Sequence, residues 1–193
     1  TGMTVNGGVT AVSLASADGK LTKTIKLQAL SNPSAPVTVA ITVDKASICS
    51  IDKASIVLEK ENTDKKQFVL TTAMAGICTL SFTSTSTDSG YNGLTISNLV
   101  ITVMSSPLPP TDVLVVSTGL TQVLKIDWTA PINTGNTPVT GYQIQQSTDS
   151  GSTWTDMVPN TGNTATAHTQ TGLVNDQSYS IRVATINTVG TSS

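Results

Sequence analysis

The sequence predicts an all-β protein made of two tandem β-sandwiches. Apolar and polar residues alternate with a period of two in most segments, and turn residues interrupt this alternation at short intervals. Charged residues make up 11% of the 193 residues and aromatic residues 4%. This composition favours short strands over helices, and the length suits two domains of about 100 residues each.

Alternation in the first half predicts a series of short strands, and a Gly pair divides the first of them. Gly7 and Gly8 interrupt residues 1–20, where they indicate a bulge or a switch of the strand between two sheets. Further strands are predicted at residues 24–29, 37–43, 47–51, 55–58, 67–72, 77–84 and 95–103. Because no helical period occurs, residues 1–104 are expected to form one sandwich of immunoglobulin-like type.

The two cysteines, Cys49 and Cys78, lie on alternating segments with matching inward phase. Cys49 shares a strand face with Ile51, and Cys78 shares one with Leu80 and Phe82. A disulfide between strands fits this pattern and would stabilise the fold by about 3–4 kcal/mol. The alternative is a pair of buried free thiols. A disulfide agrees with an extracellular compartment.

A proline-rich segment at residues 105–110 separates the two halves. It carries three prolines in four residues, which impose extended geometry and remove backbone donors. The predicted organisation is a sandwich at residues 1–104, a short semi-rigid linker at 105–110 and a second sandwich at 111–193.

The second half resembles a fibronectin type III domain. The resemblance lies in PLPPTDVLVV, in Trp128 followed by Pro131, and in PVTGYQIQQS with Tyr142. TGLVNDQSY places Leu173 six residues before Tyr179, the tyrosine-corner pattern of the family. The resemblance implies that Trp128, Tyr142, Leu173 and Tyr179 are structural core residues, and that the Tyr179 hydroxyl bonds to backbone near Leu173.

The first half resembles the tandem immunoglobulin-like repeats of large microbial and algal surface proteins. The resemblance covers about residues 9–104 and lies in PSAPVTV and in GICTLSFTSTSTDSGYNGLTISNLVITV. It implies an immunoglobulin-like sandwich placed outside the cell.

Fibronectin type III domains have a seventh strand, and this sequence shows no recognisable last strand after residues 189–193. One explanation is truncation of a longer polypeptide. The other is that a neighbouring subunit supplies the strand, which makes Ile181 and Val183 the candidate inter-subunit edge. Met3–Val5 and Val9–Leu14 have the alternation of a donor, and head-to-tail donation would build fibres.

No segment carries the pattern of a catalytic site, and the protein is expected to be no enzyme and to need no cofactor or metal. His168 is the only histidine and has no acid or Cys spaced to join it. Asp18, Asp44 and Asp52 lie near strand ends, as does Asp64, without the cluster that calcium requires. Trp154 is a candidate for stacking on a sugar, although packing within its hairpin is the simpler role.

The charge balance excludes some partners. Net charge is -2, without a basic patch for nucleic acid, and no apolar run reaches the length that spans a membrane. We therefore expect a non-enzymatic extracellular unit of a cell-surface, filament or adhesin-type protein, with protein partners that include copies of itself or neighbouring surface domains. The alternative is an accessory spacer or carbohydrate-binding module of a secreted carbohydrate-active enzyme.

Overall fold

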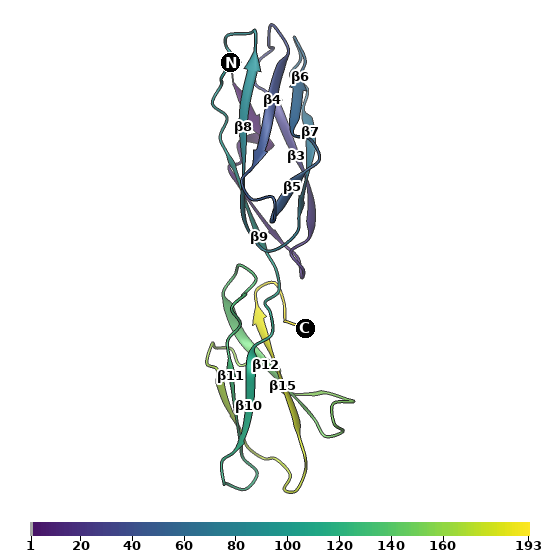
Figure 1. The fold of residues 1–193 in the computed structure, drawn as a ribbon, viewed down its shortest axis with the longest axis vertical. Helices are drawn as coiled ribbons and strands as arrows, with labels where there is room; N and C mark the ends of the chain where they lie inside the picture. The colour runs from purple at the N-terminus through teal and green to yellow at the C-terminus, as the bar shows by residue number, and fades with distance from the viewer. Residues whose placement is uncertain (1) are drawn as a thin grey trace. The chain divides into compact units, whose positions relative to one another are not determined.

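The computed structural model describes residues 2–193, and the chain divides into two compact units, Thr1–Met104 and Ser105–Ser193. Each unit consists of two β-sheets (Figure 1). The only helical element in the described residues is the 3₁₀ turn η1 (Asn6–Gly8), and no helix there has the length and apolar character to cross a membrane. The predicted all-β class is confirmed.

The first unit is a sandwich of a four-stranded and a five-stranded sheet. The smaller sheet has the order β1 (Met3–Val5), β3 (Leu21–Ala29), β7 (Lys66–Thr72) and β5 (Cys49–Ile51). The larger sheet has the order β2 (Ala11–Ala15), β9 (Leu99–Met104), β8 (Gly76–Ser86), β4 (Val37–Val43) and β6 (Ser55–Leu58). All neighbouring strands are antiparallel except β2 and β9, which are parallel.

The Gly pair at the start of the chain is where the strand changes sheets. Gly7 and Gly8 have φ of 75° and 90°, a region that residues with a Cβ rarely adopt. Before them β1 pairs with β3 in one sheet, and after them β2 pairs with β9 in the other. Of the two possibilities that the sequence raises, the switch between sheets is the one observed.

A disulfide joins the two sheets of the first unit through their core. Cys49 on β5 and Cys78 on β8 are bonded, with Cα atoms 6.3 Å apart and a sequence separation of 29. Both residues are buried among the aliphatic side chains that alternate along the strands, such as Leu70 and Leu80. Their predicted pairing is confirmed, and the alternative of two free thiols is wrong.

The last strand of the first unit is shorter than the sequence predicts. It begins at Leu99 rather than Thr95, which forms only an isolated bridge with Thr83. The reason lies in Ser84, whose hydroxyl donates to the Tyr91 carbonyl and accepts the Leu94 N–H. These bonds hold residues 91–94 as a turn against the end of β8, so the ladder with β9 starts only after it.

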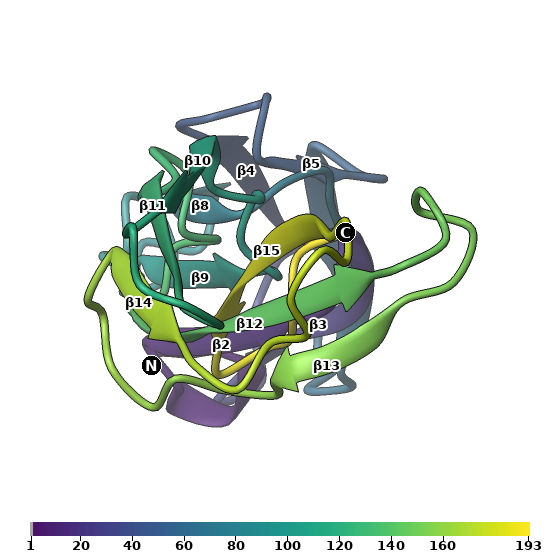
Figure 2. The ribbon, with the colours of Figure 1, turned by 90° about the horizontal axis from the view of Figure 1, so that it is seen from below.

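The second unit has two three-stranded sheets (Figure 2). One has the order β10 (Thr111–Ser117), β11 (Leu124–Thr129) and β14 (Ala167–Gln170). The other has the order β13 (Thr155–Val158), β12 (Val139–Ser147) and β15 (Ser180–Asn187). All pairings are antiparallel.

The core of the second unit is built around one aromatic pair. Trp128 on β11 and Tyr142 on β12 meet edge to face, with ring centroids 5.0 Å apart, and they are 5% and 1% exposed. Ile126, Ile144 and Val183 complete the cluster. Few other apolar side chains are fully buried in this unit, so its stability depends strongly on these two rings.

The segment that the sequence predicts as a linker is hydrogen-bonded into the second unit. Ser105 donates its N–H to the Gly135 carbonyl, and Leu108 donates to the Asn133 carbonyl. Gly135 has φ of 77°, and a Cβ there would lie 2.0 Å from the Ser105 oxygen, so only glycine fits. The second unit therefore begins at Ser105.

Removal of the disulfide by Cys49→Ala with Cys78→Ala should lower the unfolding free energy of the first unit by about 3–4 kcal/mol, because the unfolded chain regains the freedom of the closed loop. Chemical denaturation of the full chain, with Trp fluorescence to follow the second unit and circular dichroism to follow both, measures this. A variant whose first unit keeps its original midpoint would contradict the expected role of the disulfide.

Trp128→Ala should destabilise the second unit by about 3–5 kcal/mol, because it leaves a cavity beside Tyr142. The matched control is Trp154→Ala, which changes a half-buried ring outside the core and should cost about 1 kcal/mol. Denaturant midpoints of the two variants give the comparison. Equal losses would show that Trp128 is not the main core residue.

Candidate functional site

Within residues 2–193, half of strand β15 has a hydrogen-bonded neighbour on one side and none on the other. It pairs with β12, and Thr185 lies opposite Tyr142 in that ladder. Thr185 directs its N–H and C=O away from β12, toward Ser192, while Tyr142 directs its own toward Thr161. Antiparallel strands alternate between bonded and non-bonded pairs, so Val183 and Ile181 also point their backbone groups outward.

Part of this outward edge is occupied by the same chain. After β15 the chain turns back, and Asn187 donates its N–H to the Gly190 carbonyl while Ser192 donates to the Thr185 carbonyl. Ile186 and Thr191 form an isolated antiparallel bridge. Within residues 2–193 the backbone groups of Ile181 and Val183 find no partner on this edge, which is the edge that the sequence indicates.

Asn187 fixes the turn that follows β15. Its side-chain Nδ2 donates to the carbonyls of Ser105 and Thr134, and its Oδ1 accepts the N–H groups of Val189 and Gly190. The residue is 5% exposed, so all of its polar atoms are used inside the unit. The direction in which residues 190–192 run along β15 is therefore set by this one amide.

The apolar face of β10 is left uncovered in the opposite sheet. Val115 pairs with Ile126, and cross-strand neighbours point to the same face of a sheet. Ile126 is fully buried, yet Val115 is 39% exposed. An inward-facing Val with this exposure indicates that the opposite sheet does not extend over β10. The sequence signal was the apolar run Val113–Val116, which alternation alone does not explain.

The two segments that the sequence offers as strand donors are already paired within the first unit. Met3–Val5 forms β1 and bonds to β3, and residues 11–15 form β2 and bond to β9. Both strands lie at the edge of their sheets. They could thus meet another strand by their outer edges, but they could be donated whole only by leaving the first unit.

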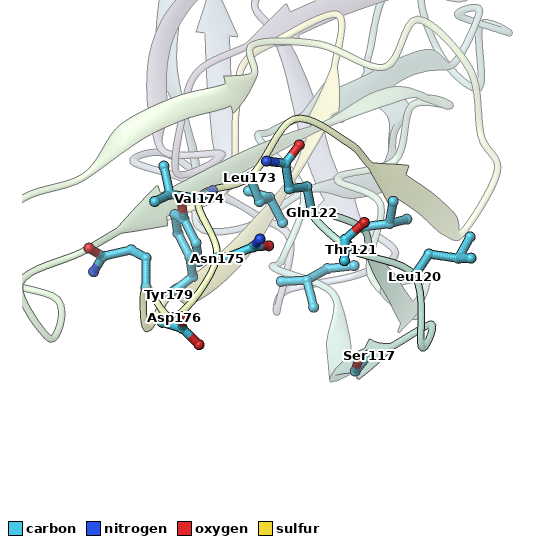
Figure 3. A pocket seen from close by; sticks show the side chains of 12 residues that line it. Ser117, Leu120, Thr121, Gln122, Leu173, Val174, Asn175, Asp176 and Tyr179 are labelled. Atoms are coloured by element: carbon cyan, nitrogen blue, oxygen red, sulfur yellow. The ribbon is translucent and has the colours of Figure 1, made fainter.

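The predicted tyrosine corner closes the loop before β15. The Tyr179 hydroxyl accepts the N–H of Val174, at 3.1 Å, next to Leu173. Leu173 is buried, whereas Tyr179 is only half-buried because its ring lines an open pocket of about 230 Å³ (Figure 3). Leu120 and Gln122 line the other side. The resemblance implied that Tyr179 is a core residue, whereas in the structure it is half-buried and anchors a loop.

Trp154 packs within the hairpin between β12 and β13, which extends away from the sheet (Figure 1, Figure 2). The Arg182 guanidinium lies over its ring, 4.4 Å from the centroid, and Arg182 Nε also donates to Gln145 Oε1. A Cβ at Gly151 would lie 3.4 Å from the same ring. Arg182 thus occupies one face of the ring, and the geometry favours the packing role.

Asp149 organises the tip of this hairpin. Its carboxylate accepts hydrogen bonds from the Ser147 hydroxyl and from both the hydroxyl and the N–H of Thr153. These bonds, first that of Ser147 and then those of Thr153, lower the pKa of Asp149 from 3.8 to about 2. The charged carboxylate is thus part of the hairpin structure and is not a reactive group.

The remaining candidates for chemistry have structural partners. Asp18, Asp44 and Asp52 each accept a backbone N–H, from Lys20, Thr79 and Val69, which accounts for their position at strand ends. His168 lies on β14 with its Nε2 3.2 Å from Gln170 Oε1. In the part of the chain that the structure describes, no three His, Cys, Asp or Glu residues come together as a metal site.

The geometry of the second unit agrees with a comparison against protein families. Residues 108–193 match the model of the fibronectin type III domain. The match covers the second unit from Leu108 to its last residue. Trp128, Tyr142 and the tyrosine corner all lie within the matched residues.

Two solved structures are similar to all or part of this chain. Domains A168–A170 of titin align with all of this chain at a TM-score of 0.52 and 18% identity, and the chain spans 63% of that structure. The kinase region of twitchin from C. elegans aligns with 46% of the chain at 25% identity and a TM-score of 0.41, and 15% of that structure is covered. The titin likeness shows the fold alone.

The pKa of Asp149 should be measurable as a carboxyl titration by NMR, with a midpoint of about 2. Because the folded value lies below the unfolded one, the hairpin gains stability from this group above about pH 4 and loses it as the pH falls through about 2. Thr153→Val removes one donor and should raise the midpoint toward 3.8. A native midpoint near 3.8 would contradict the assigned hydrogen bonds.

Proposed function

We propose that this chain is a non-enzymatic structural and protein–protein interaction unit of an extracellular protein of the cell-surface or filament type. The observation that carries the proposal is the edge of β15 at Ile181 and Val183, which has no strand partner within residues 2–193. The strand of the opposite sheet that approaches β15 is β10, which carries the exposed Val115. Fibronectin type III and immunoglobulin-like domains are generally non-catalytic. The Cys49–Cys78 disulfide supports an oxidising compartment.

The contact made by this unit is the addition of a β-strand from a neighbouring polypeptide. A strand laid antiparallel along β15 would accept the N–H groups of Ile181 and Val183, which residues 190–192 do not reach. Its inward side chains would be apolar, because they would face β10, which approaches β15 and exposes Val115. Backbone bonds would supply affinity, and this apolar cover would supply selectivity.

Head-to-tail assembly is the polymerising form of this function. The partner strand would then come from the first unit of the next copy, where β1 and β2 each have an open outer edge. A contact between two different surfaces of the same molecule can repeat from copy to copy. It builds a ring if the rotation between copies closes, and a filament if it does not. Edge pairing of this kind leaves the first unit folded.

The carbohydrate-binding alternative has less support. Sugar recognition by a sandwich module needs aromatic faces open to solvent, and Arg182 occupies one face of the Trp154 ring. We therefore place the interaction site at β15 and not at the hairpin.

Ile181→Pro tests the proposal, since it removes an N–H that faces away from β12 near the start of the strand, where proline is tolerated. Ile181→Val is the control, because it keeps this N–H. In the control, the NMR signals of the Val115 methyl groups should shift as the protein concentration rises, because the added strand covers them. The midpoint of this shift should be about tenfold higher in Ile181→Pro. Identical midpoints, or no shift in the control, would contradict strand addition at β15.

A further inference from the structure

The larger sheet of the first unit presents a broad outward face without charge. On β2, β9, β8, β4 and β6, the residues that alternate with the buried ones are all Thr, Ser, Ala, Val, Ile or Met. No residue of these five strands is Asp, Glu, Lys, Arg or His, and the outward positions carry no aromatic ring. We call this surface the uncharged face.

The uncharged face has two chemically distinct parts. Hydroxyl groups gather where β8 meets β4, because Thr85 pairs with Thr38 and Ser81 pairs with Thr42. Apolar groups gather where β8 meets β9, with Ile77 45% and Val100 37% exposed on adjacent, diagonal positions. Small and β-branched side chains at regular spacing make such a surface flat and stiff.

The other sheet of the same unit is different. Its outward positions include Lys26, which is exposed on β3, and the amides of Gln28 and Gln67. Sheet faces that remain in water commonly carry charged side chains. The smaller sheet has Lys26 at such a position, and the larger sheet has no charged residue at all.

We infer that the uncharged face is an interaction surface for the same face of a second copy of this chain. Without charges it offers nothing to an anion or a cation, and without rings it offers no platform for a sugar or a base. Against its own copy it meets no like charge, and small side chains let two sheets pack about 10 Å apart. Ile77 and Val100 would then be withdrawn from water.

The size of the face sets the strength of the contact. Five strands at about 4.8 Å spacing and rows about 20 Å long give an area of about 500 Å² on each copy. A pair of copies would bury about 1,000 Å², the lower limit for a specific interface. The contact is therefore weak and reversible, and it is separate from the strand addition at β15.

The experiment compares two lysine variants of the full chain, both made in the Ile181→Pro background, in which strand addition at β15 is weakened. Thr83→Lys places a charge at an exposed position of the central strand β8, and Thr24→Lys places the same charge on the opposite sheet. In a two-fold contact each Thr83→Lys dimer brings two like charges into the interface. Sedimentation equilibrium over a concentration series gives the association constants.

The Ile181→Pro parent should show reversible dimer formation that moderate NaCl does not weaken, as expected for an uncharged contact. Thr83→Lys should reduce the association constant at least about tenfold, and Thr24→Lys should leave it unchanged. Thr38→Lys on β4 replaces Thr83→Lys if that variant lacks the native unfolding transition. A parent that stays monomeric would overturn the inference and leave the face to a different partner. Equal behaviour of the two lysine variants would overturn it as well.

Discussion

Backbone hydrogen bonding along β15 is the constraint on which the account of the second unit depends. A strand in a sandwich satisfies its N–H and C=O groups through its neighbours, and β15 has β12 on one side. On the other side Asn187 turns the chain so that residues 190–192 reach only Thr185 and Asn187. Within residues 2–193, the backbone groups of Ile181 and Val183 therefore have no partner on that side, and Val115 on β10 is exposed.

The two units differ in the size of their cores and in the kind of surface that their sheets expose. In the first unit a disulfide and a core of many aliphatic residues hold two sheets of four and five strands, so that unit needs no further strand. In the second unit the Trp128–Tyr142 pair holds a small core between three-stranded sheets. The open β-edge and the uncharged face are thus separate properties, one of backbone pairing and the other of side-chain composition.

The sequence predicts the fold well where the evidence is local. Alternation places Cys49 and Cys78 with the same inward phase, and the structure joins them. It also places strand β15 and its edge residues Ile181 and Val183 correctly along the chain. Local patterns fail at Thr95, where the hydroxyl of Ser84 holds a turn and delays β9, a bond that depends on tertiary approach.

The features that matter most for interaction depend on contacts between residues distant in sequence, and local sequence patterns could not predict them. The exposure of Val115 depends on how far the opposite sheet extends, which alternation in β10 cannot report. The role of Asn187 depends on Ser105 and Thr134, residues distant in sequence. The uncharged face, in contrast, was present in the sequence of the five strands, and only their order in one sheet was missing.

Amide hydrogen exchange resolved by residue tests the central claim most directly. In dilute solution the amides of Ile181 and Val183 should exchange fast, while those of Arg182 and Ala184, which face β12, should be protected. In the assembled state Ile181 and Val183 should become protected as well. Protection of these two amides in dilute monomer, or continued fast exchange in the assembly, would contradict an open β15 edge that accepts a partner strand.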